Sequence, residues 1–416
     1  MKKIKYWIFQ KCGILIIRVP ILYAIAKHFI SSLKVLQIKP LYQYVCENGG
    51  IIELISDNIV MEYEKVLEDS SKYESGDYYT EMRACSRQYV SILHDVSIRG
   101  DTDGIIHNKS YYTDKIDFDR QGLSDHPPVY STIKNDKILI LNKRQRDVRR
   151  IDHAIFLVKM WSYNYFHFVF EGLSRLGSVD HLDKYKDWPI ILDECVRFDH
   201  RNIDILNLLN VNDRKVIWIQ NGELLQVENL LVPACMTWAI WDVSVSVKNG
   251  WGYMISKEAG RYLRDTILSG GGYKPQKEYN CVYVARGNNK RLINETQIID
   301  ILGKAGFEIF YPDKTKTFQE ELDCFTTAKC IVLCAGGAST NLVFCNKNVD
   351  IFCILPYKYR CDSAQDITHT VGINVKLRDA VIEEDNGFLM KSKFWFSPDK
   401  CQEIIEYCKQ KKYLRN

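Results

Sequence analysis

The fold is decided by a segment that opens with Cys281-Val-Tyr-Val-Ala-Arg286 and closes with Cys330-Ile-Val-Leu-Cys-Ala-Gly-Gly-Ala-Ser-Thr-Asn341. Each of these two sequences contains a short apolar run of the kind found in buried strands. Between the two runs, the apolar residues of the stretch 298–305 recur at helical spacing. The order strand, helix, strand predicts a crossover unit in a parallel sheet.

The polar residues that follow both runs indicate a ligand site. The first run leads into Arg286 and Arg291, and the second leads into the pair Gly336-Gly337. The carboxyl ends of parallel strands open onto a crevice, where a glycine turn lets backbone N–H groups approach a phosphate. Arginines at one strand end and glycines at the next suit a diphosphate. The alternative is a plain strand-to-helix turn with solvated arginines, because a glycine pair is far less specific than a full dinucleotide motif.

Further residues of this region occur in an order that is known from an enzyme family. They are Tyr283-Val-Ala-Arg286, Arg291, Asn294-Glu295, Gly306-Phe-Glu308, Tyr311-Pro312 and Thr340-Asn-Leu342. A second motif lies upstream at 164–176, where an aromatic run around His167 is followed by Glu171 and then by Arg175-Leu176. Together these motifs, spread over residues 151–356, resemble glycosyltransferase family 61.

The resemblance implies a fold and an activity. Family members similar to this chain are inverting sugar transferases of GT-B architecture, and in bacteria many serve capsule or lipopolysaccharide assembly. Such enzymes hold the nucleotide-sugar donor in the C-terminal domain and the acceptor in the N-terminal domain, and their last helix often crosses back to the first domain. The donor-binding residues implied here are Arg286, Arg291, Asn294, Glu295, Gly336, Gly337, Ser339, Thr340 and Asn341.

The glycine turn departs from the family pattern. Members usually carry His-Gly-Ala-Gly before the Thr-Asn pair, whereas this chain has Ala335 in place of the histidine and Ala338 in place of the last glycine. A methyl group cannot accept a proton. Either His167 or a carboxylate therefore carries the proton chemistry, or this member is altered in donor or activity.

His167 and Glu171 are four residues apart in the stretch 164–176, which we predict to be a helix. Side chains at this spacing project from the same face. A carboxylate one turn from an imidazole holds its tautomer and raises its basicity, and inverting sugar transfer needs a base for the acceptor hydroxyl. His167 is thus the predicted catalytic base, with Glu171 as its partner. The alternative for a histidine in so aromatic a segment is a hydrogen-bonded core residue.

Length and composition point to a folded protein of more than one domain. The chain has 416 residues, of which 46% are hydrophobic and 26% are charged, as in ordinary globular proteins, and its length exceeds what one core usually holds. A net charge of +4, without a dense Lys/Arg stripe, gives no support to a nucleic-acid partner. No Asp-x-Asp pair occurs near the expected donor site, so we predict no metal, and no cofactor beyond the nucleotide-sugar substrate.

The 14 cysteines form no Cys-x-x-Cys pair, and many lie in apolar runs, as Cys281, Cys330 and Cys353 do. A free cysteine packs as a small hydrophobic residue. We therefore expect reduced core cysteines in a cytosolic protein rather than a secreted disulfide scaffold.

Residues 1–39 are apolar and basic. Lys11, Arg18, Lys27 and Pro20 interrupt the apolar stretch, so it offers no uninterrupted window of the about 20 apolar residues that a transmembrane helix needs. It also lacks the small-residue cleavage site of a secretory signal. We expect an amphipathic helix that lies on an anionic membrane surface, and the alternative is an ordinary helix packed on the first domain.

These observations predict an α/β protein of two Rossmann-like domains (GT-B type), with a β-containing leading segment and a basic amphipathic N-terminal helix. The expected parts are a membrane-surface segment at 1–39, a β-rich leading segment at 40–150, an acceptor domain at 151–255, a donor domain at 256–396 and a returning helix at 397–416. Further strands are expected at 51–55, 89–93, 154–158, 188–192, 216–219, 230–232 and 352–355, and helices at 256–267 and 399–412.

The leading functional hypothesis is an inverting glycosyltransferase, peripheral on the inner face of the cytoplasmic membrane. It would transfer sugar from a nucleotide-sugar to a lipid- or polysaccharide-linked glycan in bacterial capsule or lipopolysaccharide synthesis. The alternative is a catalytically inactive binding or scaffold protein of a polysaccharide assembly complex, which Ala335 and Ala338 favour. A nucleotide-dependent oxidoreductase is disfavoured, because no G-x-G-x-x-G motif follows a strand.

Overall fold

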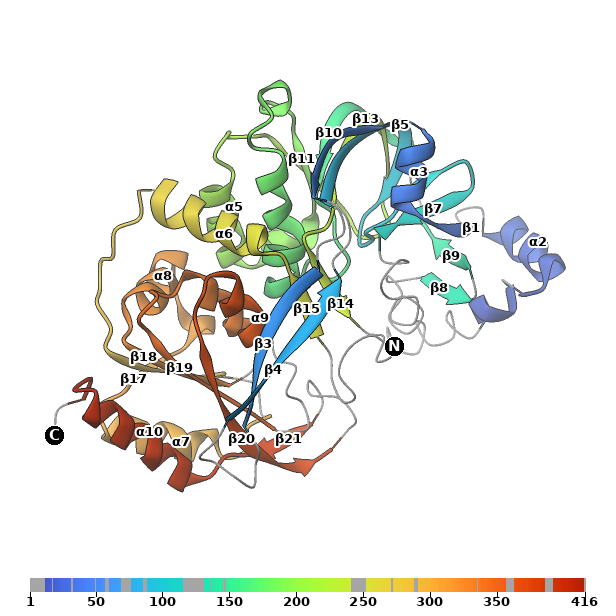
Figure 1. Ribbon diagram of the computed structural model, residues 1–416. Coiled ribbons are helices and arrows are strands. Elements are labelled where there is room, and N and C mark those ends of the chain that lie inside the picture. Colours follow the sequence, from blue (N-terminus) through green and yellow to red (C-terminus); the bar gives the residue numbers. More distant parts are fainter. Residues whose placement is uncertain are drawn as a thin grey trace. The chain divides into compact units, whose positions relative to one another are not determined.

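The computed structural model describes residues 12–16, 18–30, 33–48, 50–56, 60–68, 76–84, 88–114, 131–134, 136–143, 145, 147–240, 252–270, 272–287, 291–334, 336–356, 363–385 and 392–414 (Figure 1). The chain is a mixed α/β protein, as predicted, and it divides into two compact units. Unit 1 comprises Met1–Ile59 and Cys85–Asp242, and unit 2 comprises Val60–Ala84 and Val243–Asn416.

Unit 1 is built around one 11-stranded mixed sheet, in the order β12-β11-β10-β13-β5-β6-β7-β1-β9-β8, with β2 paired to β5. Its strands are β1 (Leu33–Pro40), β2 (Ile51–Ser56), β5 (Gln88–Arg99), β6 (Ile105–His107), β7 (Ser110–Thr113), β8 (Ser131–Lys134), β9 (Lys137–Leu141), β10 (Arg149–Phe156), β11 (Ile190–Asp193), β12 (Val216–Ile219) and β13 (Leu224–Pro233). The short strand β14 (Thr237–Ile240) follows. The strands expected in the leading segment and those expected in the acceptor domain thus share a single sheet.

The segment 1–39 is not a separate piece of the molecule. Residues Leu33–Pro40 form β1, which pairs in parallel with β7 and antiparallel with β9. Three side chains of this strand, Leu33, Leu36 and Ile38, are buried. The expected boundary at residue 39 is therefore wrong, because sheet pairing continues through it.

Strand β10 also differs from its prediction. The expected strand covered 154–158, whereas β10 spans Arg149–Phe156 because it pairs in parallel with β13 from Arg149 onward. Its first half is largely exposed, and its last three residues are buried. The apolar run in the sequence marks only the buried end of β10, because a hydrophobic pattern reflects burial and not strand pairing.

The helices of unit 1 are short. They are α2 (Pro20–Phe29), α3 (Leu41–Glu47), the π-helix η2 (His167–Gly172), the 3₁₀ helices η3 (Leu173–Ser178), η4 (Asp183–Tyr185) and η5 (Glu194–Phe198), and α5 (His200–Leu209). The helix expected at 164–176 is therefore present, but it consists of a π turn followed by a 3₁₀ turn. Helix α2 carries Pro20 in its first turn, where a proline costs no helical hydrogen bond.

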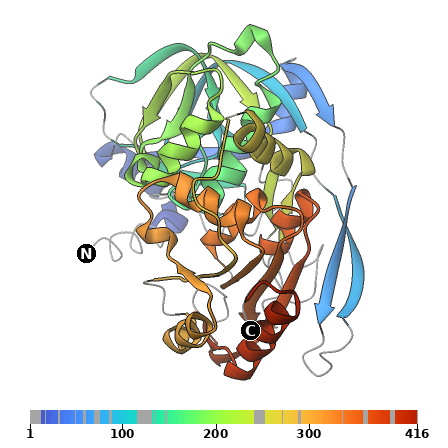
Figure 2. The ribbon, with the colours of Figure 1, turned by 90° about the vertical axis from the view of Figure 1, so that its left-hand side faces the viewer.

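Unit 2 contains a six-stranded sheet in the order β17-β16-β18-β19-β20-β21, parallel except for β21. Its strands are β16 (Cys281–Val284), β17 (Glu308–Phe310), β18 (Cys330–Cys334), β19 (Asp350–Pro356), β20 (Val375–Glu384) and β21 (Lys393–Trp395). Its helices are α6 (Lys257–Asp265), η6 (Thr266–Gly270), α7 (Glu295–Lys304), η7 (Pro312–Lys314), α8 (Phe318–Thr327), η8 (Gly337–Phe344), α9 (Ser363–Thr370) and α10 (Pro398–Gln410), and β15 (Gly252–Ile255) precedes them. The hairpin of β3 (Val60–Glu68) and β4 (Gly76–Ala84) is a long two-stranded ribbon (Figure 2).

The predicted strand–helix–strand unit is confirmed, with an addition. Strand β16 leads through α7 to β17, and α8 then leads to β18, which pairs in parallel with β16. Strand β17 was not predicted, because only one residue of this three-residue edge strand is buried. Strands β16 and β18 are buried along their whole length, which explains their unbroken apolar sequence.

Helix α10 packs inside unit 2. Its buried residues Cys401, Ile404, Ile405 and Cys408 belong to the same core as Ile298 and Leu302 of α7. The two helices lie side by side (Figure 1). The apolar face of α10 is therefore covered by the core of unit 2.

The cysteines of the described residues are free thiols, and most are buried. Within the described part of the chain, none of the helices combines the length and the apolar character that spanning a bilayer requires.

Candidate functional site

His167 and Glu171 form a buried pair in unit 1. Nδ1 of His167 lies 2.7 Å from Oε1 of Glu171, and both side chains are almost fully enclosed. His167 opens the π-helix η2, in which residues four apart stand nearly above one another. The ring of Trp161 lies 5.2 Å from the imidazole, centroid to centroid. A neutral imidazole that donates from Nδ1 to the carboxylate offers Nε2 as a proton acceptor.

Lys159 lies beside this pair and forms an ion pair with Glu171. It was not predicted as a site residue from the sequence. Its Nζ lies 3.6 Å from Oε2 of Glu171 and 3.3 Å from Oδ2 of Asp103. Burial alone would lower the pKa of Lys159, but the electrostatic effects of Cys235, Asp103 and Glu171 outweigh it and raise the pKa above its usual range. Lys159 therefore stays a cation between two carboxylates. A buried ionic group of this kind marks a candidate functional site.

Asp193 fixes the backbone around Lys159. Oδ1 accepts from the backbone N–H of Asp101 at 2.7 Å, and Oδ2 accepts from Ser162 Oγ at 2.8 Å and from the backbone N–H of Lys159 at 3.3 Å. Burial raises the pKa of Asp193 to about 7, although these donors oppose the rise. The last residue of β11 thereby joins the loops that follow β5 and β10.

Arg175 braces the same region from within the helix. Its guanidinium donates to the carbonyl of Val158 at 3.3 Å and to that of Gly172 at 3.4 Å. Burial lowers the pKa of Arg175. Since both acceptors are backbone groups, Arg175 holds η2 and η3 against the end of β10, and its place in the aromatic motif is explained by support of the His167 helix.

In unit 2, the guanidinium of Arg286 lies against Gly336, the first glycine of the Gly336-Gly337 turn. Arg286 follows β16, and Gly336 follows the neighbouring parallel strand β18. A Cβ built on Gly336 would lie 2.7 Å from Nη2 of Arg286, and the φ of Gly336 is +154°. The positive φ favours glycine at this position, and a side chain there would displace the guanidinium of Arg286. The predicted proximity of an arginine and a glycine turn at adjacent strand ends is present in the fold.

Two of the predicted donor-binding residues, Asn294 and Glu295, hydrogen-bond to protein groups in the structure. Oε1 of Glu295 accepts from the backbone N–H of Arg286 at 2.8 Å and from the hydroxyl of Tyr283 at 3.1 Å. Asn294 exchanges two hydrogen bonds with the backbone of Phe396, at 2.8 and 3.1 Å. Both side chains bind protein groups, so the structure gives them a supporting position.

The residues of the glycine turn differ in accessibility. Gly336 is half-buried and Gly337 is exposed, whereas Ser339, Thr340 and Asn341 in the 3₁₀ helix η8 are buried. Nδ2 of Asn341 donates to Glu321 Oε2. Arg291 is buried as well. A ligand at this edge would therefore meet Arg286 and the glycines first.

One prediction lies outside the described residues. Ala335, which replaces the histidine of the family pattern, is not among them, whereas Ala338 is described and half-buried. The membrane-surface segment is likewise described only from Cys12 onward, with gaps.

A weak sequence signal existed for the residues that were missed. Lys159 directly follows the apolar run 154–158, and Asp193 directly follows the run 188–192. Polar residues immediately after buried strands are the same signal that identified Arg286. Asp103, by contrast, lies in a short loop with no flanking pattern, and only the fold places it beside Lys159.

One protein family matches a span that contains both the His167–Glu171 pair of unit 1 and the Arg286–Gly336 pair of unit 2. The family model described as Glycosyltransferase 61 matches residues 165–352, a span that includes His167, Glu171, Arg286 and the glycine turn. No curated protein sequence matches the chain. Residues 165–352 therefore form a glycosyltransferase family 61 region.

Proposed function

We propose that the chain is an inverting glycosyltransferase that moves a sugar from a nucleotide-sugar donor to a lipid- or polysaccharide-linked glycan. The acceptor would belong to bacterial surface-polysaccharide synthesis, as in capsule or lipopolysaccharide. The observation that carries the proposal is the buried His167–Glu171 pair, which lies inside the family 61 match and has Lys159 beside it.

The pair suits the proton transfer that this reaction needs. Inversion requires the acceptor hydroxyl to attack the anomeric carbon directly, so a base has to take the hydroxyl proton. The 2.7 Å contact between Nδ1 of His167 and Oε1 of Glu171 fixes the orientation of the ring, and in this proposal Nε2 accepts the proton. Lys159 stabilises the anionic form of Glu171 at 3.6 Å, and the anionic carboxylate in turn stabilises the imidazolium that forms.

The leaving group is a nucleoside diphosphate, and Arg286 is the residue that we assign to it. A guanidinium binds phosphate oxygens with two parallel charge-assisted hydrogen bonds. The half-buried Arg286 lies against Gly336, whose missing side chain leaves the backbone free to approach the ligand. A fixed cation of this kind stabilises charge that develops on the leaving oxygen. In this proposal the cation takes the part that a metal plays in other transferases.

The GT-B architecture is part of the proposal. The parallel strands and covering helices of unit 2 support a donor-binding domain, because ligands bind at the carboxyl ends of such strands. Unit 1, whose helix η2 carries His167, would bind the acceptor.

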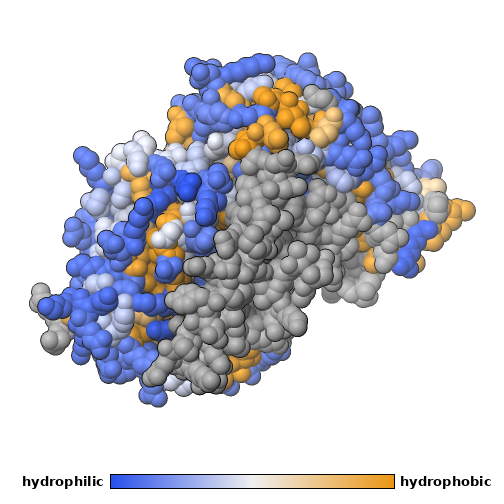
Figure 3. All heavy atoms as spheres, in the orientation of Figure 1, coloured by the Kyte–Doolittle hydropathy of each residue, from blue (hydrophilic) through white to orange (hydrophobic). Residues whose placement is uncertain are grey.

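We further propose peripheral attachment to the inner face of the cytoplasmic membrane through α2. Its side chains Ile21 and Ile25 are 67% and 53% exposed, and Lys27 lies in its last turn. Figure 3 shows hydrophobic atoms at the right-hand tip, where Figure 1 places this helix. Apolar side chains next to cations suit an anionic lipid surface, which would bring the enzyme to a lipid-linked acceptor.

Donor turnover tests the proposal directly. Purified chain is incubated with a panel of nucleotide-sugars, with and without lipid-linked glycan, and the nucleoside diphosphate released is measured. We expect release from one donor class, stimulated by acceptor and greatly reduced by His167→Gln. Donor binding without release in every combination, unchanged by His167→Gln, would support the alternative of a catalytically silent scaffold, which the alanine at position 338 favours.

A further inference from the structure

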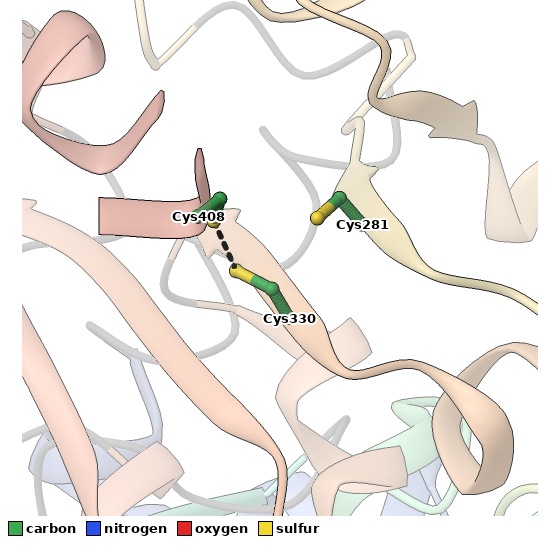
Figure 4. Close-up of side chains that lie close together, drawn as sticks. All are labelled: Cys281, Cys330 and Cys408. Carbon is green, nitrogen blue, oxygen red and sulfur yellow. Dashed lines mark hydrogen bonds between the residues drawn. The ribbon is translucent and has the colours of Figure 1, made fainter. Parts of the chain in front are cut away.

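Three cysteine thiols of unit 2 converge in its core, remote in sequence from one another (Figure 4). They belong to Cys281 in β16, Cys330 in β18 and Cys408 in α10. The three sulfur atoms all lie within 4.8 Å of one another, and those of Cys330 and Cys408 are 3.4 Å apart. The residues are 1%, 0% and 0% exposed.

The register of the sheet creates this cluster. Cys281 and Cys330 are the first residues of adjacent parallel strands and are direct partners across the pair. Partnered residues point to the same face of a sheet. Helix α10 covers that face, and Cys408 in its last turns completes the group. The convergence is thus fixed by strand pairing and by helix packing together, and not by a mobile loop.

We propose that these three thiols bind a thiophilic d¹⁰ metal ion, of the class of copper(I) or zinc(II). All three donors are sulfur, and soft thiolate ligands select such ions over magnesium, calcium or manganese. A metal–sulfur bond of about 2.3 Å requires sulfurs roughly 3.8–4.0 Å apart in a shared site. The separation of Cys330 and Cys408 is 3.4 Å, and no sulfur of the group lies more than 4.8 Å from another, which is compatible with that spacing after small side-chain rotations.

The donor set narrows the class of ion. Thiols release their protons when they bind a metal ion, so uptake should weaken as the pH falls. The group contains no histidine or carboxylate. Three sulfurs complete the coordination of copper(I), whereas zinc(II) would add an exogenous ligand.

Such an ion would join α10 to strands β16 and β18. An ion that binds the folded chain and not the unfolded chain stabilises the fold in proportion to its occupancy. The site lies at the amino ends of β16 and β18, and Arg286 follows the carboxyl end of β16, so its role would be structural and separate from sugar transfer.

The test uses full-length chain that is reduced with a phosphine and kept anaerobic. Copper(I) is titrated against a chromophoric copper(I) chelator, and zinc(II) against a fluorescent zinc chelator, and the melting temperature is recorded with and without ion. We expect one ion per chain from at least one of the two, together with a rise in melting temperature. Cys408→Ala and Cys281→Ala should each weaken binding at least tenfold and abolish the rise.

Cys353→Ala is the matched control, because Cys353 is a buried thiol of β19 in the same sheet and lies outside the cluster. It should retain both the stoichiometry and the thermal shift. Circular dichroism confirms that each variant is folded, and if one of the two cluster variants fails to fold, the other decides. The proposal is overturned if the reduced chain takes up neither ion, or if Cys353→Ala reduces binding as much as the cluster variants do.

Discussion

Replacing Lys159 by methionine tests the charge arrangement around His167. Lys159 is buried between Asp103 at 3.3 Å and Glu171 at 3.6 Å. Methionine keeps most of the side-chain volume but removes the charge, so two buried carboxylates lose their cation. We expect a large loss of stability, because an uncompensated buried charge is costly.

The expected loss of stability follows from the distances between Nζ of Lys159 and the two carboxylates. At an effective dielectric constant of about 20, a pair of unit charges at either separation attracts by about 5 kcal/mol before desolvation is counted. Part of this gain is offset in the native protein by the cost of burying the lysine. Loss of one partner of a buried ionic group typically destabilises by about 3–5 kcal/mol, and we expect Lys159→Met to fall in that range.

The assay is urea unfolding at pH 7.5 and at pH 5. The variant should regain part of its stability at pH 5, since protonation of the remaining carboxylates removes the unpaired charge. Lys304→Met is the control, because Lys304 pairs with Asp300 at 2.7 Å while its side chain is 76% exposed. An exposed pair contributes about 1 kcal/mol or less.

Adding Asp103→Asn to Lys159→Met should restore part of the loss, because one unpaired carboxylate is then neutral. A loss for Lys159→Met no larger than that of the control, and equal at both pH values, would refute the charge arrangement derived for this site.

The remaining predictions concern catalysis, donor binding, pH dependence and the membrane. His167→Gln should lower turnover by about 10²–10⁴-fold with donor affinity unchanged, as for a general base; a proportional fall in melting temperature would instead identify a packing role. Arg286→Ala should weaken nucleoside-diphosphate binding by about 1.5–3 kcal/mol, the value of a hydrogen bond to a charged group, and unchanged calorimetric affinity would remove Arg286 from the site. Burial raises the pKa of Asp193 to about 7, above its unfolded value, so its contribution to stability is complete in acid and is lost as pH rises toward 7. Asp193→Asn should therefore flatten the fall in unfolding free energy between pH 5 and pH 7.5, and an unaltered slope counts against the shift. Substituting both Ile21 and Ile25 by aspartate should abolish sedimentation with anionic vesicles without loss of folding; retained sedimentation would exclude α2 as the attachment surface.

The local pattern predicted a substantial part of the fold. The apolar runs of β16 and β18 and the helical spacing of α7 were each recognisable, because strands buried on both faces and amphipathic helices leave a periodic signature. The spacing of His167 and Glu171 likewise predicted a shared face, and they are in contact at 2.7 Å. Such features depend on neighbours close in the chain.

Other features depend on pairing and could not be predicted in this way. The inclusion of β1 in the large sheet was hidden, because Leu33–Pro40 continues an apolar segment and nothing local distinguishes its partner strands. Helix α10 has an apolar face, but the sequence does not say which core covers it. The π turn at His167 was also hidden, since its residues have ordinary helical spacing.

By itself, the sequence determined the strand–helix–strand order around Arg286, the position of Arg286 and of the glycine turn at strand ends, and the pairing of His167 with Glu171, because each is set by periodicity over a few residues. Only the tertiary structure placed Lys159 between Asp103 and Glu171 and brought three cysteines together. These contacts join segments far apart in the chain. Their partners are selected by strand register and core packing, which minimise the free energy of the whole fold and leave no mark in a local stretch of sequence.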